Sequence, residues 1–316
     1  MVKSRLRESA YKAFHEKNSV QRQIARRLFS TMQAIGFHLS ADHFYDTIPN
    51  TNLVKKNYSD DPRPCTGIDL RFEESEQFLV QSMRKYAPEI SGNVITQCGF
   101  VNSNPYFKNL DAIALYIHIR EHRPRKIIEV GQGMSTRIIS SACKCNWEED
   151  RSQPLTTLTT IDPYARIDTS EMCGDWMVAE VVRNEVQSID PSLFAALDEN
   201  DLMFIDSSHV YKFGSDVEFE FQHVYPHLSP GSFVHIHDVF TPYEYPKRWL
   251  VKRKQFWNEQ YHLEQFLRFN SMFEVVLPVH LLCRRSTSVA DAFASALLSD
   301  AGYSVGGTSF YLKRTG

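Results

Sequence analysis

From Lys126 onward, short apolar segments alternate with amphipathic ones, and this alternation limits the possible folds more than any other feature of the chain. Buried strands are predicted at residues 126–130, 158–161, 202–205, 232–236, 273–278 and 309–313. Helices are predicted between them at residues 135–143, 175–184, 214–224 and 257–270. Short apolar strands separated by helices indicate an α/β, doubly wound architecture, in which helices cover both faces of a mostly parallel sheet.

The first third of the chain lacks this alternation. A helix is predicted from Lys3 to about Ile35, where Gly36 stops it, and further helices are predicted at residues 73–86 and 110–121. Residues 37–70 contain three prolines and read as an irregular segment. We therefore expect an N-terminal helical and irregular cap segment at residues 1–105, followed by a ligand-binding domain at residues 106–316.

Composition argues against nucleic-acid-binding, membrane and disulfide-rich proteins. A formal net charge of -3 argues against general nucleic-acid binding. The first predicted helix is basic, but its apolar residues are sparse, so we expect a solvated helix on the main domain and no membrane contact. The six cysteines are dispersed, which is typical of reduced thiols, and no apolar run has membrane-spanning length. A cytoplasmic protein is the default expectation.

A glycine loop follows the first predicted strand of the sheet. Gly131 and Gly133 carry no side chain, so backbone amides at the start of the next helix could approach a ligand closely. The next strand ends in Asp162, and an acid at that position can accept two hydrogen bonds from a ribose. The pairing predicts a cofactor that contains a nucleoside.

At this point the sequence resembles a known family. Glu129-Val-Gly-Gln-Gly-Met-Ser-Thr136 resembles the first motif of class I S-adenosylmethionine-dependent methyltransferases, and Thr160-Ile-Asp-Pro163 resembles the second. The segments 200–209, 228–231 and 233–238 resemble the fourth strand, the Pro-Gly turn and the fifth strand of the small-molecule enzymes in that class. Dehydrogenases usually have a third glycine where this chain has Thr136.

The resemblance covers the chain from about Tyr106 to the end. It implies a Rossmann-like, seven-stranded sheet whose last strand, within residues 307–313, is antiparallel. The preceding hundred residues resemble the leading segment of a bacterial branch of the family. Residues 106–316 would then be the domain that binds S-adenosyl-L-methionine.

The resemblance also implies roles for individual cofactor-binding residues. Glu129 would lie near the methionine amino group, Gly131 and Gly133 would face the methionine and ribose, and Asp162 would hold the ribose hydroxyls. Further cofactor contacts are expected from Ser135, Thr136, Gln187, Asp206 and Phe107. For Ser135 a simple helix cap is an equal alternative.

Four polar residues at the ends of two adjacent strands form the candidate catalytic centre: Asp206, His209, His237 and Asp238. The spacing of Asp206 and His209 resembles that in metal-assisted catechol-type O-methyltransferases, where a lysine fills the position of His209 and removes the hydroxyl proton. Histidine could act as this base at neutral pH without a large pKa shift. Alternatively, His209 orients the substrate or caps a loop. His235 lies earlier in the strand that ends at His237 and Asp238, and it is predicted to be a hydrogen-bonded core histidine.

A divalent metal would take oxygen ligands from Asp206 and Asp238. The family supplies a further amide next to them, but this chain has Val239 there, which puts the metal in doubt.

Aromatic residues suggest where a substrate could bind. Tyr243, Tyr245 and Trp249 follow the fifth strand in a segment with two prolines, which is expected to form a lid. Tyr106 and His43 are also expected near the substrate.

The leading functional hypothesis is O-methylation of a small-molecule hydroxyl on a specialised metabolite, as in natural product biosynthesis, or on a sugar. The alternatives are an N-methyltransferase acting on a small-molecule amine and a non-catalytic binding protein with the same fold. The expected partner is a small-molecule acceptor, without nucleic acid or membrane, and a homodimer stays open.

Overall fold

The computed structural model describes residues 20–39 and 47–316. The chain divides into two compact units. Of the described residues, 20–39, 47–59 and Pro246–Phe256 form the smaller unit, and Asp60–Tyr245 and Trp257–Gly316 form the larger one. The larger unit begins at Asp60, and in it the helix that follows Arg71 packs against the helices next to the sheet.

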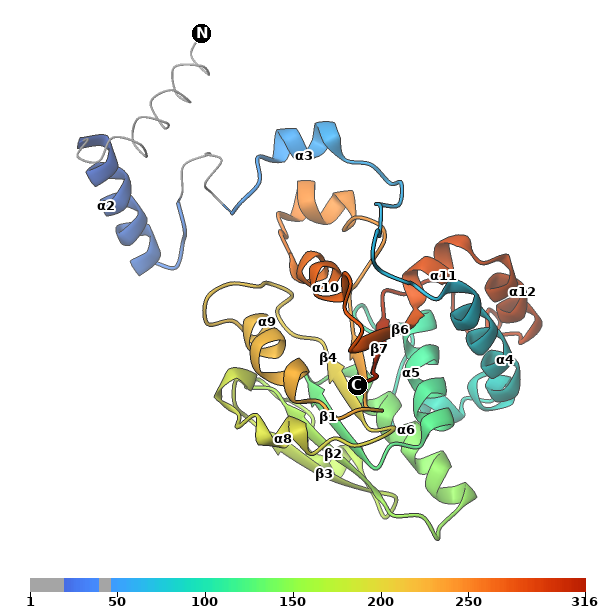
Figure 1. Ribbon diagram of the computed structural model, residues 1–316. Coiled ribbons are helices and arrows are strands. Elements are labelled where there is room, and N and C mark those ends of the chain that lie inside the picture. The colour runs from blue at the N-terminus through green and yellow to red at the C-terminus, as the bar shows by residue number, and fades with distance from the viewer. Residues whose placement is uncertain (1–19, 40–46) are drawn as a thin grey trace. The chain divides into compact units, whose positions relative to one another are not determined.

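The larger unit is built on one seven-stranded sheet (Figure 1). Its strands are β1 (Lys126–Val130), β2 (Thr156–Ile161), β3 (Met177–Val182), β4 (Leu202–Ile205), β5 (Phe233–Ile236), β6 (Phe273–Pro278) and β7 (Phe310–Arg314). Their order is β3-β2-β1-β4-β5-β7-β6. β1 to β5 pair in parallel, whereas β7 is antiparallel to both β5 and β6. This confirms the doubly wound, Rossmann-like fold with an antiparallel last strand.

One predicted element is wrong. Residues 175–184 were expected to form a helix, but Met177–Val182 forms the edge strand β3, which pairs only with β2. Val178, Val181 and Val182 are β-branched and therefore fit an extended strand better than a helix. Because β3 lies at the edge, most of its residues are partly exposed, and the segment lacks the continuous apolar run of the central strands.

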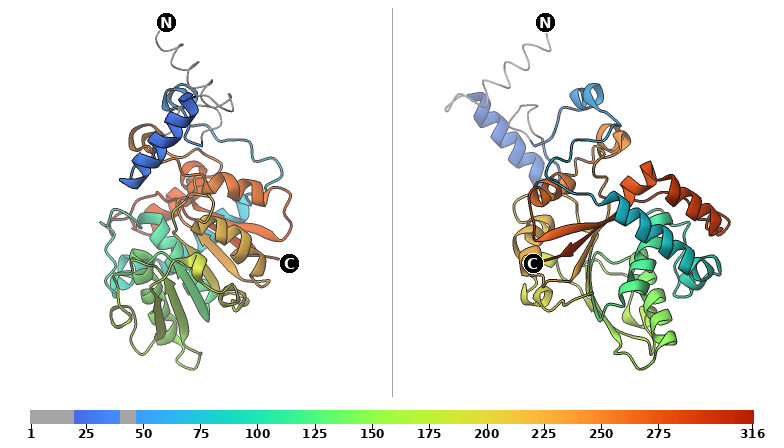
Figure 2. Two further views of the ribbon diagram at one scale, coloured as in Figure 1. Left: turned by 90° about the vertical axis from the view of Figure 1, so that its left-hand side faces the viewer. Right: turned by 45° about the vertical axis from the view of Figure 1, so that its right-hand side comes forward.

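Helices cover both faces of the sheet (Figures 1 and 2). One face carries α4 (Phe72–Ser91), η1 (Val94–Thr96), α5 (Asn109–His122), α6 (Met134–Glu149), α7 (Thr169–Met172), α11 (Val279–Arg285) and α12 (Thr287–Ser295). The other carries η2 (Val186–Ser188), α8 (Ser192–Ala195), α9 (Asp216–Phe219), η3 (Glu220–Val224), η4 (Tyr225–His227) and α10 (Glu259–Leu267). The predicted helices at 73–86, 110–121 and 135–143 are confirmed as α4, α5 and α6.

Each face of the sheet has its own hydrophobic core. On the first face, Met83, Ile113 and Ile138 of α4, α5 and α6 pack in one buried cluster. On the second, Phe194 of α8 and Leu263 of α10 belong to another. The side chains of β1, β4 and β5 alternate between the two clusters, as expected for central strands buried on both sides.

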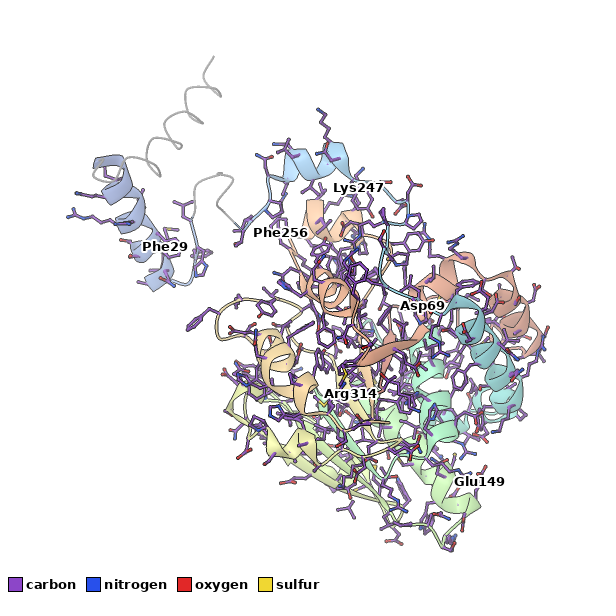
Figure 3. All side chains as sticks on the ribbon, viewed as in Figure 1. Phe29, Asp69, Glu149, Lys247, Phe256 and Arg314 are labelled. Atoms are coloured by element: carbon purple, nitrogen blue, oxygen red, sulfur yellow. The ribbon has the colours of Figure 1, made fainter. Side chains whose placement is uncertain are left out.

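The smaller unit contains α2 (Val20–Ala34), α3 (Thr51–Asn57) and η5 (Trp249–Arg253). Of the predicted N-terminal helix, the part from residue 20 onward is described, and α2 forms there and ends at Ala34. In this unit Lys247 lies over the ring of Tyr58 at 5.2 Å. Figure 3 labels Lys247 and Phe256 near the two ends of the segment that contributes η5. Across the described ranges, no helix has both the length and the apolar character needed to cross a bilayer.

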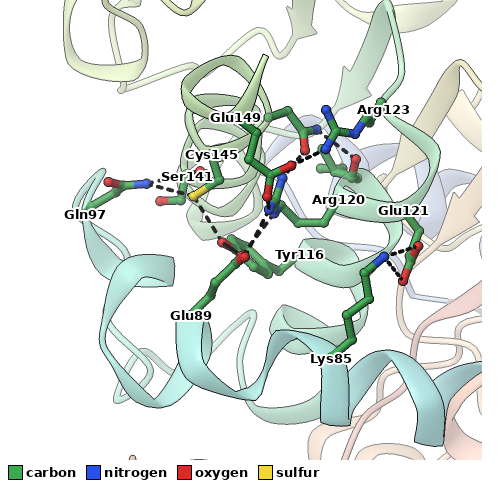
Figure 4. Close-up of polar contacts among 12 residues, drawn as sticks. Lys85, Glu89, Gln97, Tyr116, Arg120, Glu121, Arg123, Ser141, Cys145 and Glu149 are labelled. Carbon is green, nitrogen blue, oxygen red and sulfur yellow. Dashed lines mark hydrogen bonds and ion pairs between the residues drawn. The ribbon is translucent and has the colours of Figure 1, made fainter.

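A buried arginine ties α4, α5 and α6 together (Figure 4). The side chain of Arg120 on α5 is only 1% exposed. Its guanidinium donates through Nε and Nη2 to both oxygens of Glu89 at 3.0 Å, and it also binds Asn146 and Glu149 of α6. The chain thus satisfies this buried charge from the two helices that flank α5.

Replacing Arg120 with methionine should destabilise the protein by about 1.5–3 kcal/mol, because Glu89, Asn146 and Glu149 lose their hydrogen bonds to a charged partner. Lys85→Met is the matched control: Lys85 pairs with Glu121 on the same helices but is 59% exposed, so its loss should cost about 1 kcal/mol or less. Urea denaturation measures both values. Equal losses in the two variants would contradict a structural role for the buried network.

Candidate functional site

The glycine loop after β1 lies directly against the end of β4. Gly131 has a φ of +84°, and a Cβ atom added to it would lie 2.3 Å from the carbonyl oxygen of Asp206. No other residue type fits this position without moving the backbone. A Cβ on Gly133, by contrast, would meet nothing within 4 Å. The loop therefore has a tight inner side and an open outer side, where a ligand could approach.

Glu129 is fully buried beneath the loop. Ser135 and Thr136, at the start of α6, donate their hydroxyl protons to its two carboxyl oxygens, each at 2.7 Å. Burial raises the pKa of Glu129 to about 8, with Asp206 and Asp162 adding to the effect and the two hydroxyls opposing it. At neutral pH this acid is mostly protonated, and a cation bound beside it would favour the carboxylate and lower its pKa. Both hydroxyl protons are engaged by Glu129, so a contact from Ser135 or Thr136 to a ligand carboxylate stays a prediction.

Asp162 lies at the carboxyl end of β2 and faces the same loop. Its two oxygens accept hydrogen bonds from the backbone of Gln132 at 3.0 Å and of Tyr164 at 2.7 Å. The side chain of Gln132 in turn fixes the segment after β2 by bonding to the backbone of Arg166 and Ile167. Sequence reasoning missed this role of Gln132, although its position between the two glycines was a signal.

Two further candidates lie near this edge of the sheet. Gln187 is half-buried in η2, just after β3, and bonds to Glu185. Phe107 is buried, with its ring centroid 5.0 Å from that of His237 and 5.7 Å from that of Phe204. Phe107 thus packs beneath the candidate catalytic residues.

The four candidate catalytic residues lie together at the carboxyl ends of β4 and β5. Asp206 Oδ1 is 3.3 Å from Nε2 of His209 and 3.4 Å from Nδ1 of His237. Asp238 Oδ2 lies 4.0 Å and 3.9 Å from the same two nitrogens. Two carboxylates and two imidazoles therefore form one cluster, as the adjacency of the two strands predicted.

Two members of this cluster have an unusual backbone. His209 has a φ of +60° and Asp238 a φ of +56°, a region that residues other than glycine seldom adopt. The surroundings hold them there: the hydroxyl of Thr308 donates to Asp238 at 2.9 Å, and the carbonyl of His209 accepts from the backbone of Asn258 and Glu259. Such backbone strain gathers at functional sites.

The cluster shifts the pKa of its members strongly. Burial alone would lower the pKa of His209, but hydrogen bonds to Asp206 and Glu259 raise it to about 10. The pKa of His237 is also raised, by Asp238, Asp206 and Asp111 against the effect of burial. The two imidazoles in turn hold the pKa of Asp206 well below its usual range. His209 therefore does not have the ordinary pKa that would suit a base at neutral pH, because its carboxylate neighbours stabilise the charged ring.

Two acids that were not among the predicted catalytic residues complete the cluster. Glu259 Oε2 lies 2.8 Å from Nδ1 of His209, and Asp111 Oδ2 lies 3.6 Å from Nε2 of His237. Asp111 also accepts from the backbone of Thr308 and Ser309, which joins α5 to the start of β7. Nothing in the local sequence marks these acids, since each meets its histidine only through the tertiary fold.

The aromatic substrate candidates are scattered. Tyr243 and Tyr245 are buried, and the Tyr245 hydroxyl accepts from the backbone of Gln260 at 3.2 Å. Tyr106 is 81% exposed, on the loop before α5. Trp249 belongs to the smaller unit, and His43 lies outside the described residues. Their contacts with substrate stay predictions.

His235 is buried in the core, as predicted, and its ring stacks on Tyr311 at 4.1 Å. Neither ring nitrogen has a hydrogen-bond partner among the described residues, so the predicted hydrogen bond is wrong.

The residues do not fit a metal centre. Asp206 and Asp238, the expected ligands if a divalent ion were bound, lie instead against the two imidazoles. Within residues 20–39 and 47–316, no group of three His, Cys, Asp or Glu side chains is arranged to hold a metal ion.

Glu129 should make the stability of the protein depend on pH. Its pKa is about 8 in the folded protein and near 4.5 when unfolded, so unfolding releases a proton between these values and stability falls as pH rises through this range. Between pH 5.5 and 7.5 the loss should be about 2–3 kcal/mol. The isosteric variant Glu129→Gln should lack this loss. Thermal denaturation at several pH values measures both proteins, and parallel curves would contradict the raised pKa.

Part of the chain is similar to known methyltransferases. A family model described as a methyltransferase domain matches residues 128–239, which run from β1 to just beyond β5. An uncharacterised protein of Archaeoglobus fulgidus is 29% identical over 181 residues, which are 54% of this chain and 79% of that protein.

Two solved structures show weaker likeness. A provisionally assigned O-methyltransferase from Klebsiella pneumoniae has 12% identity and a TM-score of 0.36, with 84% of this chain and 95% of that chain covered. A provisionally assigned methyltransferase from Thermobifida fusca has 9% identity and a TM-score of 0.37, with 80% and 96% covered. Likeness at this level says nothing about chemistry.

The matched region holds the glycine loop, the acid that ends β2 and the Asp206–His209 pair, all at one edge of a sheet with the expected strand order. Residues 128–239 therefore match a methyltransferase domain, and the glycine loop and the strand order around it are those expected of a class I S-adenosylmethionine-dependent methyltransferase.

Proposed function

We propose that this methyltransferase acts on a hydroxyl group of a small molecule, a specialised metabolite or a sugar. The observation that carries the proposal is the position of His209, whose Nε2 faces Asp206 at 3.3 Å while Nδ1 is held by Glu259 at 2.8 Å. A ring fixed through one nitrogen can exchange a proton through the other, which is what methylation of a hydroxyl requires.

The residues around the glycine loop fit the cofactor. Glu129 would pair with the methionine ammonium group, Asp162 would accept from the ribose hydroxyls, and the open side of Gly133 leaves room for the ligand. Gln187, in η2 after β3, would contact the adenine. When bound, S-adenosyl-L-methionine supplies an electrophilic methyl group on a positively charged sulfur.

The raised pKa of His209 has to fall before the ring can accept a proton at neutral pH. Its hydrogen bond to Asp206 is one cause of the raised value. A substrate hydroxyl that enters between these two side chains would replace this bond, and the positive charge of the cofactor would further disfavour the charged ring. His209 would then take the hydroxyl proton on Nε2, while Asp206 and His237 orient the substrate oxygen.

Asp162→Ala should abolish binding of S-adenosylhomocysteine, because the variant removes both ribose acceptors and the acceptor for the loop amide of Gln132. Asp168→Ala, at an exposed acid of the following segment that pairs with Arg183, is the matched control and should bind as the wild type does. Isothermal calorimetry measures binding, and thermal denaturation checks folding. A folded wild-type protein that gives no binding heat would refute the cofactor assignment.

His209→Gln should lower the rate of methyl transfer by about 10²–10⁴-fold if the acceptor is a hydroxyl, because the variant has no group that can take the proton. His262→Gln on α10, where the ring stacks on Tyr211, is the control and should keep the rate within about threefold of the wild type. The assay follows labelled methyl groups from S-adenosylmethionine into a deproteinised host extract. A near-normal rate in His209→Gln would favour N-methylation, since an amine can arrive uncharged.

A further inference from the structure

We propose that Glu259 is the positioning residue for His209: it fixes the ring through Nδ1–H, so that Nε2 faces the reacting centre. The proposal rests on the proposed role of His209 in proton transfer. Glu259 Oε2 lies 2.8 Å from Nδ1 of His209, and both side chains are buried, at 1% and 4% exposure. A carboxylate behind a catalytic imidazole selects the nitrogen that stays free for chemistry.

Backbone hydrogen bonds connect the same two segments that the His209–Glu259 side-chain contact connects. The carbonyl oxygen of His209 accepts hydrogen bonds from the backbone nitrogens of Asn258 at 3.1 Å and of Glu259 at 3.2 Å. Asn258 also bonds through its side chain to the backbone of Tyr211. The loop after β4 is therefore tied to the first turn of α10, and the positive φ of His209 is held from outside the loop.

Packing against Trp257 also limits the rotation of the His209 ring. The ring of Trp257 lies 4.3 Å from the ring of His209, at an angle of 42°. With Trp257 beside it, Glu259 behind it and Asp206 in front of it, the imidazole has one orientation in which both nitrogens are bonded. A general base works best when it is held in one orientation toward the proton that it accepts.

Burying the carboxyl group of Glu259 lowers the stability of the fold, because one of its oxygens loses its contact with water and gains no hydrogen bond from the described part of the chain. Glu259 Oε1 has no hydrogen-bond partner among the described residues, and neither has Oε1 of the nearby Glu220. Burial raises the pKa of both acids, and Glu259 adds to the effect on Glu220. Because a buried ion pair stabilises a fold little compared with apolar residues of the same size, the arrangement points to a role in the site.

The test compares Glu259→Gln with Glu264→Gln in the full-length protein. Glutamine keeps the volume of Glu259 and can still hydrogen-bond to His209. Its amide group, however, can donate to Nδ1. The proton of the neutral ring would then lie on Nε2, which could no longer accept one. Glu264 lies on the same helix, is also buried, and bonds to Thr241 and Arg63 away from the histidines. It therefore controls for the loss of a buried charge from α10.

Two measurements decide the outcome. Proton NMR should show a hydrogen-bonded Nδ1 proton, assigned by its absence in His209→Gln, that persists in Glu264→Gln and is displaced or lost in Glu259→Gln. The rate of labelled methyl transfer into a deproteinised host extract should fall about 100-fold or more in Glu259→Gln, with unchanged affinity for S-adenosylhomocysteine, and within about threefold in Glu264→Gln.

Three results would overturn the proposal: a normal rate in Glu259→Gln, an equal loss in Glu264→Gln, or an Nδ1 proton that Glu259→Gln leaves unchanged. The NMR measurement needs no substrate, so it tests the positioning even if no hydroxyl acceptor exists. Absence of labelled product from the wild type together with the expected Nδ1 behaviour would refute the proposed function alone.

Discussion

The contact between the glycine loop and the end of β4 is the constraint on which the rest of the site depends. The carbonyl oxygen of Asp206 occupies the space that a Cβ atom at position 131 would need. This approach is possible because β1 and β4 are neighbours in the sheet, so their carboxyl ends meet. It brings the loop that would hold the methionine part of the cofactor next to the carboxylate that begins the catalytic cluster. The proposed sites of the methyl donor and the acceptor would thus share one backbone contact.

Charge compensation is the second organising feature. The carboxylates of Asp111, Asp206, Asp238 and Glu259 surround His209 and His237, and most of these side chains are buried. A buried carboxylate is costly unless a cation or several donors lie near it. The histidines supply the cations, and this is why their pKa values rise. Since the same charges would respond to a bound sulfonium, ligand binding and the protonation of the site are coupled.

Much of this could be predicted from residues 126–316. The apolar runs of β1, β4 and β5 are buried on both sides and therefore easy to recognise, and the polar residues that follow them lie at one edge of any parallel sheet. β3 was missed because an edge strand is only half-buried and its pattern competes with that of a helix. The pKa of His209 could not be predicted, because Glu259 is fifty residues away in the chain.

The sequence by itself determined the fold class, the glycine loop, and the presence of Asp206, His209, His237 and Asp238 at neighbouring strand ends, because these follow from local patterns and from the geometry of parallel sheets. Only the tertiary structure decided what those side chains contact. Glu259 and Asp111 reach the histidines from α10 and α5, and Tyr245, expected in a lid, is buried by its neighbours. Burial and long-range pairing depend on how the helices pack, and this is information that no short stretch of sequence contains.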